Sequence, residues 1–139
     1  METVNQPNLG VDSSSALTSF GINFESLVDK YYDDPILFVQ ETFKVSPTPQ
    51  QSAVLKSLSL RKKVSVRAGH GVGKSTLASW AVYWFLLTRP SPKIICTAPT
   101  FHQLYDVLWA EAAMWRQKSD LITSLFDWKQ RRIEAKWNP

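Results

Sequence analysis

The sequence predicts an α/β fold, a parallel sheet flanked by helices, from three features of the chain. A β-branched stretch, Val64 to Arg67, precedes a glycine-rich turn, and an apolar helix from Ser75 to Thr88 follows that turn. A second apolar run, Lys93 to Thr97, is followed by a helical pattern from Phe101 to Gln117. Because strand–helix–strand units form right-handed crossovers, we expect the two strands to lie parallel in one sheet whose faces are both covered.

The first 46 residues precede the predicted sheet in two parts. Residues 1–22 are polar and have no apolar period, so we expect a flexible leader. Residues 23–46 predict a small helical region, in which Asn23 caps a first helix and Asp34-Pro35 starts a second. This region is acidic, and we expect it to pack against the rest of the chain as a lid or adaptor.

Residues 47–139 hold the predicted sheet domain. A proline-rich break, Ser46 to Pro49, separates it from the acidic region. Gln50 to Leu60 predicts a helix that leads into the first strand, and the residues from Leu121 onward predict one or two short strands. The whole chain has 139 residues, which is enough for one core of this kind.

The composition is that of a globular chain with a basic body. Hydrophobic residues make up 44% and charged residues 20%, which excludes an intrinsically disordered chain. Residues 1–46 hold two lysines and seven acidic residues, whereas residues 47–139 hold fourteen Lys or Arg and five acidic residues. The excess of Lys and Arg in residues 47–139 suits binding to nucleic acid. Ordinary surface charge is the alternative explanation of the same excess. The six tryptophans suit apolar packing or, alternatively, base stacking.

Several classes of protein are excluded. Cys96 is the only cysteine, so the chain has no internal disulfide and no cysteine metal cluster, which fits a reducing compartment. The first residues lack the basic start of a signal peptide. The longest apolar run, Trp80 to Leu87, is too short to span a membrane, so we expect no membrane partner.

The turn after the first predicted strand matches the phosphate-binding loop, with Ala68 in the place of its first glycine. Glycines let the backbone curl so that successive N–H groups converge on one anion, and the following helix adds the positive end of its dipole. Lys74 is predicted to reach the β- and γ-phosphates of ATP, and the Ser75 hydroxyl to bind Mg²⁺. The predicted ATP-binding residues are Gln51, Ala68, Gly69, His70, Gly71, Val72, Gly73, Lys74, Ser75 and Thr76.

Two further segments flank this loop. Gln51 is the first candidate, and Gln50 the second, for a side-chain amide that hydrogen-bonds the edge of adenine. A simpler explanation of these glutamines is that they are exposed polar residues at the start of a helix. Downstream, Thr100, His102 and Gln103 follow the second predicted strand, where open α/β sheets bind their ligands. They are candidates to face phosphate groups, whereas Thr100 also fits the N-cap of the next helix.

These segments together resemble the large terminase subunit of bacteriophages, the ATPase that drives DNA into a procapsid. The matching residues are Pro49-Gln50-Gln51, Arg67 to Ser75, and Thr97-Ala98-Pro99-Thr100 with Gln103, within roughly residues 45–120. The resemblance implies an additional-strand P-loop NTPase core, an ATP hydrolase that uses ATP and Mg²⁺, and double-stranded DNA as substrate. It also implies the portal protein and the small terminase subunit as partners, an oligomer, and the cytoplasm of a bacterial host.

The chain departs from that family in two respects. His70 stands where many members carry a loop arginine, and Arg67 lies before the turn. The acidic Asp-Glu motif that holds Mg²⁺ and activates water has no match, because the remaining acidic residues are isolated: Asp106, Glu111, Asp120, Asp127 and Glu134. The family's coupling motif and nuclease domain are also missing. We therefore expect a truncated or split-gene product that binds ATP and is incomplete for hydrolysis, with exposed sheet edges that favour self-association.

Two other functions remain open from the sequence. Helicase-like DNA motors share a glutamine motif and a Pro-Thr turn after a strand. A non-catalytic nucleotide-binding or assembly fragment would keep the loop without turnover.

Overall fold

The computed structural model describes residues 23–61, 63–71, 73–129 and 132–136. The leader predicted over residues 1–22 lies outside the described residues. The elements are α2 (Phe24–Tyr31), α3 (Pro35–Phe43), α4 (Pro49–Leu60), α5 (Lys74–Thr88), the π-helical η1 (Gln103–Trp109), α6 (Ala110–Gln117), α7 (Asp120–Leu125), β1 (Phe126–Lys129) and β2 (Arg132–Ala135). In the described ranges, no helix is both long and apolar enough to cross a membrane.

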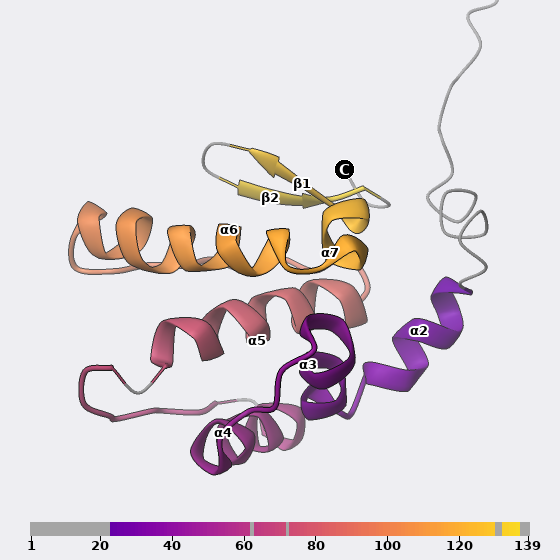
Figure 1. Ribbon diagram of the computed structural model, residues 1–139, viewed down its shortest axis with the longest axis horizontal. Helices are drawn as coiled ribbons and strands as arrows, with labels where there is room; N and C mark the ends of the chain where they lie inside the picture. The colour runs from indigo at the N-terminus through magenta and orange to yellow at the C-terminus, as the bar shows by residue number, and fades with distance from the viewer. Residues whose placement is uncertain (1–22, 62, 72, 130–131, 137–139) are drawn as a thin grey trace, which may run out of the picture.

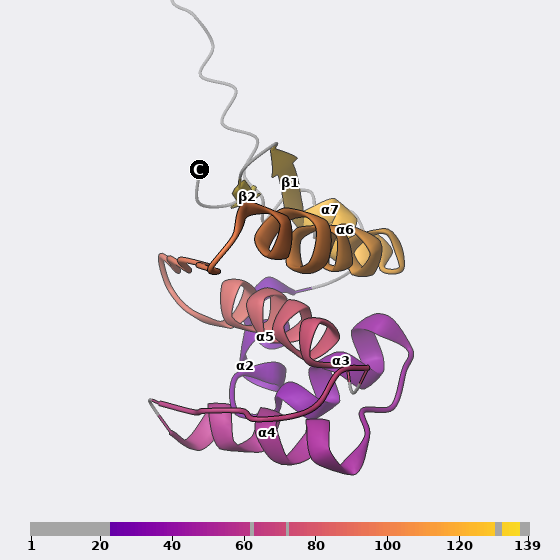
Figure 2. The same cartoon turned by 90° about the vertical axis from the view of Figure 1, so that its left-hand side faces the viewer.

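The predicted α/β architecture, a P-loop NTPase sheet of parallel strands, is wrong. The sheet found in the described residues has two antiparallel strands, β1 and β2, with Phe126 opposite Ala135. The segments Val64–Arg67 and Lys93–Thr97 have no regular secondary structure, and Figures 1 and 2 show both as irregular trace. A strand exists only through hydrogen bonds to a neighbouring strand, and β-branched residues by themselves do not supply that neighbour.

The second of these segments is also less buried than its apolar run predicts. Ile94 and Cys96 are half-buried, whereas Ile95 between them is 89% exposed. The alternation means that one side of the segment faces the helices and the other side faces solvent. The expectation of a strand covered on both faces therefore fails, because nothing in the described chain packs on its outer side.

The helices predicted from caps and periodicity are confirmed. The side chain of Asn23 accepts a hydrogen bond from the backbone N–H of Glu25, and Asp34 accepts one from that of Leu37. The helix predicted from Phe101 to Gln117 forms as η1 followed directly by α6. The short strands predicted near the end of the chain form as the β1–β2 hairpin.

Helix α5 lies at the centre of the structure. Figures 1 and 2 show α6 with the hairpin on one side of it and α2, α3 and α4 on the other. Its residues are apolar nearly all round, and Trp80, Tyr83, Trp84 and Leu87 are almost fully buried. The Trp115 ring of α6 contacts the Trp80 ring edge-on, with 5.1 Å between the ring centroids. The core is therefore a set of layers built around one helix.

Two hydrogen bonds fix the layers to α5. Trp84 Nε1 donates to the carbonyl of Tyr31 at 2.7 Å, which ties α2 to the C-terminal half of α5. The Tyr83 hydroxyl donates to the carbonyl of Ala112 at 2.7 Å, and burial raises the pKa of Tyr83 well above its usual range. The acidic region predicted as a lid or adaptor thus packs directly on the core helix.

Truncating Phe38 should destabilise the fold strongly. Its ring is fully buried and packs edge-on against Tyr31 and Phe43, so Phe38→Ala should lower the free energy of unfolding by about 3–5 kcal/mol. Phe101→Ala removes the same atoms from a ring that is 71% exposed and should cost less than about 1 kcal/mol. Urea unfolding followed by tryptophan fluorescence compares the two, and similar losses would contradict the described core.

Candidate functional site

The phosphate-loop sequence forms a turn that runs directly into a helix. Gly71 has a φ of 74° and Gly73 a φ of 79°, both in the left-handed region that favours glycine. Helix α5 begins at Lys74, and its N-cap, Gly73, offers no side-chain hydrogen bond to the first turn. The first N–H groups of α5 therefore have no side-chain cap at this position, which is the arrangement that suits an anion. Val72 lies outside the described residues.

The side chain of Lys74 folds back over the loop. Its Nζ donates hydrogen bonds to the carbonyls of Ala68 at 2.6 Å and Gly69 at 2.8 Å. The side chain is exposed, and the ammonium group lies against the loop where a phosphate is predicted. These neutral carbonyls are weaker partners than phosphate oxygens, so an anion in the loop can compete for the same ammonium group.

Gln51 supports the loop from helix α4. Its Oε1 accepts a hydrogen bond from the backbone N–H of Thr48 at 3.0 Å, and its Nε2 donates to the carbonyl of Gly73 at 3.3 Å. The side chain of Thr48 caps α4 in return, which completes a capping box. Gln51 is only 8% exposed, so its amide ties the start of α4 to the end of the loop. Sequence reasoning missed this supporting role, although the Thr-x-x-Gln spacing signals the capping box.

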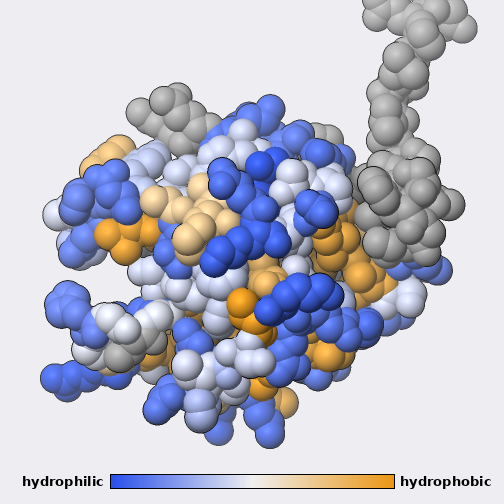
Figure 3. All heavy atoms as spheres, in the orientation of Figure 1, coloured by the Kyte–Doolittle hydropathy of each residue, from blue (hydrophilic) through white to orange (hydrophobic). Residues whose placement is uncertain are grey.

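An open cavity of about 530 Å³ lies between the loop and α4. This volume is within the range of small-ligand sites in proteins. Gln50 lines it and is exposed, so the second adenine candidate faces the cavity. The lining residues are Thr48, Gln50, Gln51, Val54, Val66, Ala68, Gly71, Gly73, Lys74 and Leu77. In Figure 3 the loop projects at the left edge.

The first turn of α5 contacts an acidic residue of α6. The Thr76 hydroxyl donates a hydrogen bond to Glu111 Oε1 at 2.5 Å, and Trp115 Nε1 donates to the same oxygen at 2.9 Å. Ser75, the predicted Mg²⁺ ligand, is half-buried, and its hydroxyl has no hydrogen-bond partner within the described residues. Glu111 is isolated among the acidic residues of the sequence, and its contact with Thr76 has no local signal because it spans 35 residues.

The remaining candidates do not converge on the loop cavity. Arg67 and His70 are exposed and form no ion pair in the part of the chain that is described. The Thr100 side chain accepts a hydrogen bond from the backbone N–H of Gln103 at 3.2 Å, which confirms its capping role. His102 Nδ1 lies 2.6 Å from Asp106 Oδ2, and neither His102 nor Gln103 lines the cavity.

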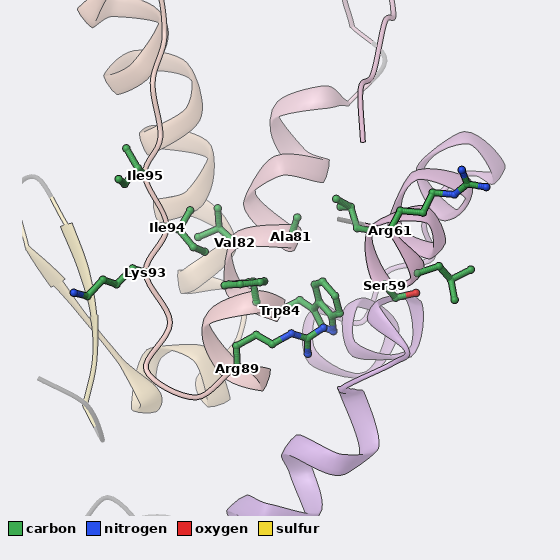
Figure 4. Close-up of a pocket in the computed structure, with 12 residues that line it drawn as sticks. Ser59, Arg61, Ala81, Val82, Trp84, Arg89, Lys93, Ile94 and Ile95 are labelled. Carbon is green, nitrogen blue, oxygen red and sulfur yellow. The ribbon is translucent and has the colours of Figure 1, made fainter. Parts of the chain in front are cut away.

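A second, larger groove of about 680 Å³ lies away from the loop, between the end of α4, the middle of α5 and residues 93–95. Figure 4 shows Ile94 directed toward Val82 and Lys93 directed away from it. The groove is mainly apolar, and Arg61, Arg89 and Lys93 also line it. It holds none of the predicted site residues, so the loop cavity remains the candidate site.

Replacing Gly73 should disturb the site more than replacing Gly71. A Cβ at Gly73 would lie 2.5 Å from Gln51 Nε2, whereas a Cβ at Gly71 meets open space. Gly71→Ala should therefore cost only the left-handed backbone penalty, about 1–2 kcal/mol, and Gly73→Ala should cost more because the Gln51 amide is displaced.

Urea unfolding of Gly73→Ala, Gln51→Ala and the double variant measures the coupling. We expect the double variant to lose less stability than the sum of the single variants, because Gln51→Ala removes the atom that clashes. Strict additivity would contradict the contact.

Comparison with known proteins adds no assignment to this geometry. The chain matches no protein-family model, no curated protein and no solved structure. The function of the loop site is therefore inferred from its own residues.

Proposed function

We propose that this chain binds ATP at the loop of residues 68–76, as the ATP-binding part of a terminase-like DNA-packaging motor. The observation that carries the proposal is the position of Lys74, whose ammonium group lies against the loop carbonyls at the start of α5. Left-handed glycines, a helix start without a side-chain cap and an adjacent cavity support the same ligand. The ATP-binding part of the proposal rests on the loop and its motif, and a parallel sheet forms no part of it.

The chemistry of the loop favours a polyphosphate over other anions. The uncapped first turn of α5 supplies N–H donors and a positive helix end, and Lys74 supplies a full charge that is free to turn toward the ligand. Exchange of two neutral carbonyl acceptors for phosphate oxygens strengthens the hydrogen bonds of the ammonium group. The cavity beside the loop has room for the base and sugar of the nucleotide.

The residues at this site suit a Mg²⁺ ion that arrives bound to the phosphates of the nucleotide. Within the described residues, no group of three or more His, Cys, Asp or Glu could hold a metal ion. Mg²⁺ at nucleotide sites needs only one or two protein ligands besides phosphates and water, and the Ser75 hydroxyl is free to serve as one. The bound ion would neutralise charge on the β- and γ-phosphates.

The motor function rests on the resemblance described above. We propose that the basic part of the chain contacts double-stranded DNA, and that the portal protein and the small terminase subunit bind in the cytoplasm of a bacterial host. Turnover needs a group that positions water, which we assign to a part of the motor other than this loop. A helicase-like motor or a non-catalytic nucleotide-binding fragment would use the same loop, and the DNA products of an active assembly distinguish these functions.

Lys74→Ala should abolish ATP binding, because it removes the only full positive charge that contacts the loop carbonyls in the described chain. The affinity for a fluorescent ATP analogue, measured by titration of the full chain, should fall by at least about 100-fold, or 2.7 kcal/mol of binding free energy. Lys56→Ala, which removes a charge from exposed α4 surface, is the matched control and should bind normally. Equal affinities for the two variants would refute the site.

The two glutamines should affect binding differently. Because the Gln51 amide holds Gly73, Gln51→Ala should weaken ATP and inorganic triphosphate to the same extent, which replaces the adenine role expected from sequence. Gln50→Ala should weaken ATP alone, since Gln50 is exposed at the cavity. Titration of both ligands against both variants tests this, and an ATP-selective loss in Gln51→Ala would restore Gln51 as the adenine contact.

A further inference from the structure

The larger groove beside α5 has apolar walls from two distant parts of the chain. The end of α4, with Leu58 and Leu60, forms one side, and Ile94 and Ile95 form the other. Figure 4 shows α5 between these two sides. The volume, about 680 Å³, is in the range of ligand-binding clefts. The groove is therefore large enough to receive part of another molecule.

Large apolar side chains in this groove are exposed to solvent. Leu60 is 73% exposed and Ile95 is 89% exposed, and Phe85 of α5 is 36% exposed in the same groove. Exposed apolar side chains that gather in one hollow mark an interaction site, because a partner that covers them removes them from water. The groove therefore suits a partner with apolar surface of its own.

One wall of the groove also offers unpaired main-chain groups. Ile94 and Cys96 are half-buried whereas Ile95 between them is exposed, which is the alternation of an extended chain. Within the described chain, the backbone of residues 93–97 forms no hydrogen bond to other backbone groups. The main chain of an extended peptide can pair with such groups, as peptides do in β-strand addition. A polypeptide thus matches this wall better than a lipid or a small apolar molecule.

The charged residues that line the groove are all cations: Arg61, Arg89 and Lys93. Arg61 and Lys93 are exposed and form no ion pair among the described residues. Neutral groups hold the Arg89 guanidinium, which donates to the carbonyl of Tyr32 at 3.4 Å and to the Thr88 hydroxyl at 3.1 Å. The positive charge in the groove therefore favours a partner that carries acidic side chains.

Acidic residues of the same region line a different cavity. Asp29, Asp33 and Asp34 line it together with two lysines, and it shares Ser59 with the groove. An acidic partner is attracted inside the groove and repelled by these aspartates, which limits where its carboxylates can lie.

We propose that the groove binds an extended, apolar segment of another protein that carries acidic side chains. The apolar side chains of this segment pack on Leu60, Phe85 and Ile95, and its carboxylates pair with Arg61 and Lys93. A nucleic acid would match the cations and leave the apolar walls uncovered. The groove shares no lining residue with the loop cavity, so the inference goes beyond the ATP-binding proposal and does not depend on it.

A short fluorescein-labelled peptide in which isoleucine and glutamate alternate is the probe. Its fluorescence anisotropy during titration with the full chain gives the affinity. One control peptide has lysine in place of glutamate, and another has serine in place of isoleucine. Each control should bind at least about 10-fold more weakly, because charge and apolar contact both contribute. Single-stranded oligothymidylate and phosphatidylserine vesicles are titrated as alternative occupants.

Ile95→Glu tests the groove itself. The side chain is exposed, so urea unfolding should be unchanged, whereas the new charge should weaken binding of the isoleucine–glutamate peptide at least about 10-fold. Phe101→Glu makes a matched change at an exposed ring outside the groove and should bind normally. Arg61→Ala should weaken the same peptide about 2- to 5-fold, and Lys56→Ala, which also lies outside the groove, should not.

Four results would overturn the inference. The first is no binding of the isoleucine–glutamate peptide below about 1 mM, and the second is equal binding of the lysine peptide. The third is tighter binding of oligothymidylate or vesicles that Ile95→Glu abolishes, which would assign the groove to nucleic acid or to a membrane surface. The fourth is a dimer in sedimentation that Ile95→Glu dissociates, which would make a second copy of this chain the occupant.

The outcome is separate from that of the ATP-binding proposal. Ile95 does not line the loop cavity, so Ile95→Glu should bind the fluorescent ATP analogue as the unaltered chain does. Loss of peptide binding with normal ATP binding is the result that we expect for this variant.

Discussion

The structure depends on the burial of α5, a helix that is apolar on nearly every side. A helix of this kind needs cover on most of its sides in water. Here α2, α3 and α4 cover one side and η1 and α6 cover the other, while Phe85 is exposed at the larger groove. Aromatic rings fill the contacts, with Trp115 between Trp80 and Phe43. The same burial holds the N-terminus of α5 in a fixed place. Because the candidate phosphate loop ends at that N-terminus, the core also determines the position of the site.

The loop is braced from both layers that cover α5. Gln51 reaches it from α4 through the carbonyl of Gly73, and Glu111 reaches the first turn of α5 from α6 through Thr76. A ligand binds more tightly when the groups of its site are already held in position, because fewer side chains and loops then lose freedom on binding. Lys74 is the group that has to move, because its ammonium rests on two loop carbonyls. The candidate site thus combines a braced backbone with one ammonium group that is held by loop carbonyls.

The terminase resemblance implies a local loop motif and a parallel sheet around it, and the described fold contains the loop without that sheet. The motif is local: Gly71 and Gly73 have left-handed backbone conformations, and α5 begins directly after the turn, at Lys74. The parallel sheet expected around it does not form in the described chain, where the segments at 64–67 and 93–97 remain without ladder partners. Self-association stays a prediction from the sequence. The proposal of ATP binding rests on the loop and needs no sheet, whereas the proposal of DNA translocation rests on the resemblance.

Local features were predictable because their causes lie within a few residues of one another. Asn23, Asp34 and Thr100 cap helices through side-chain hydrogen bonds to residues two or three positions ahead. The glycine positions of the loop and the apolar period of α5 are also local patterns. The tertiary structure alone decided the rest. Whether a β-branched segment becomes a strand depends on a partner elsewhere in space, and Ile95 is exposed because none is present in the described residues. Gln51 meets Gly73 across 22 positions and Glu111 meets Thr76 across 35, so only the packing of α4 and α6 on α5 could bring these groups to the loop.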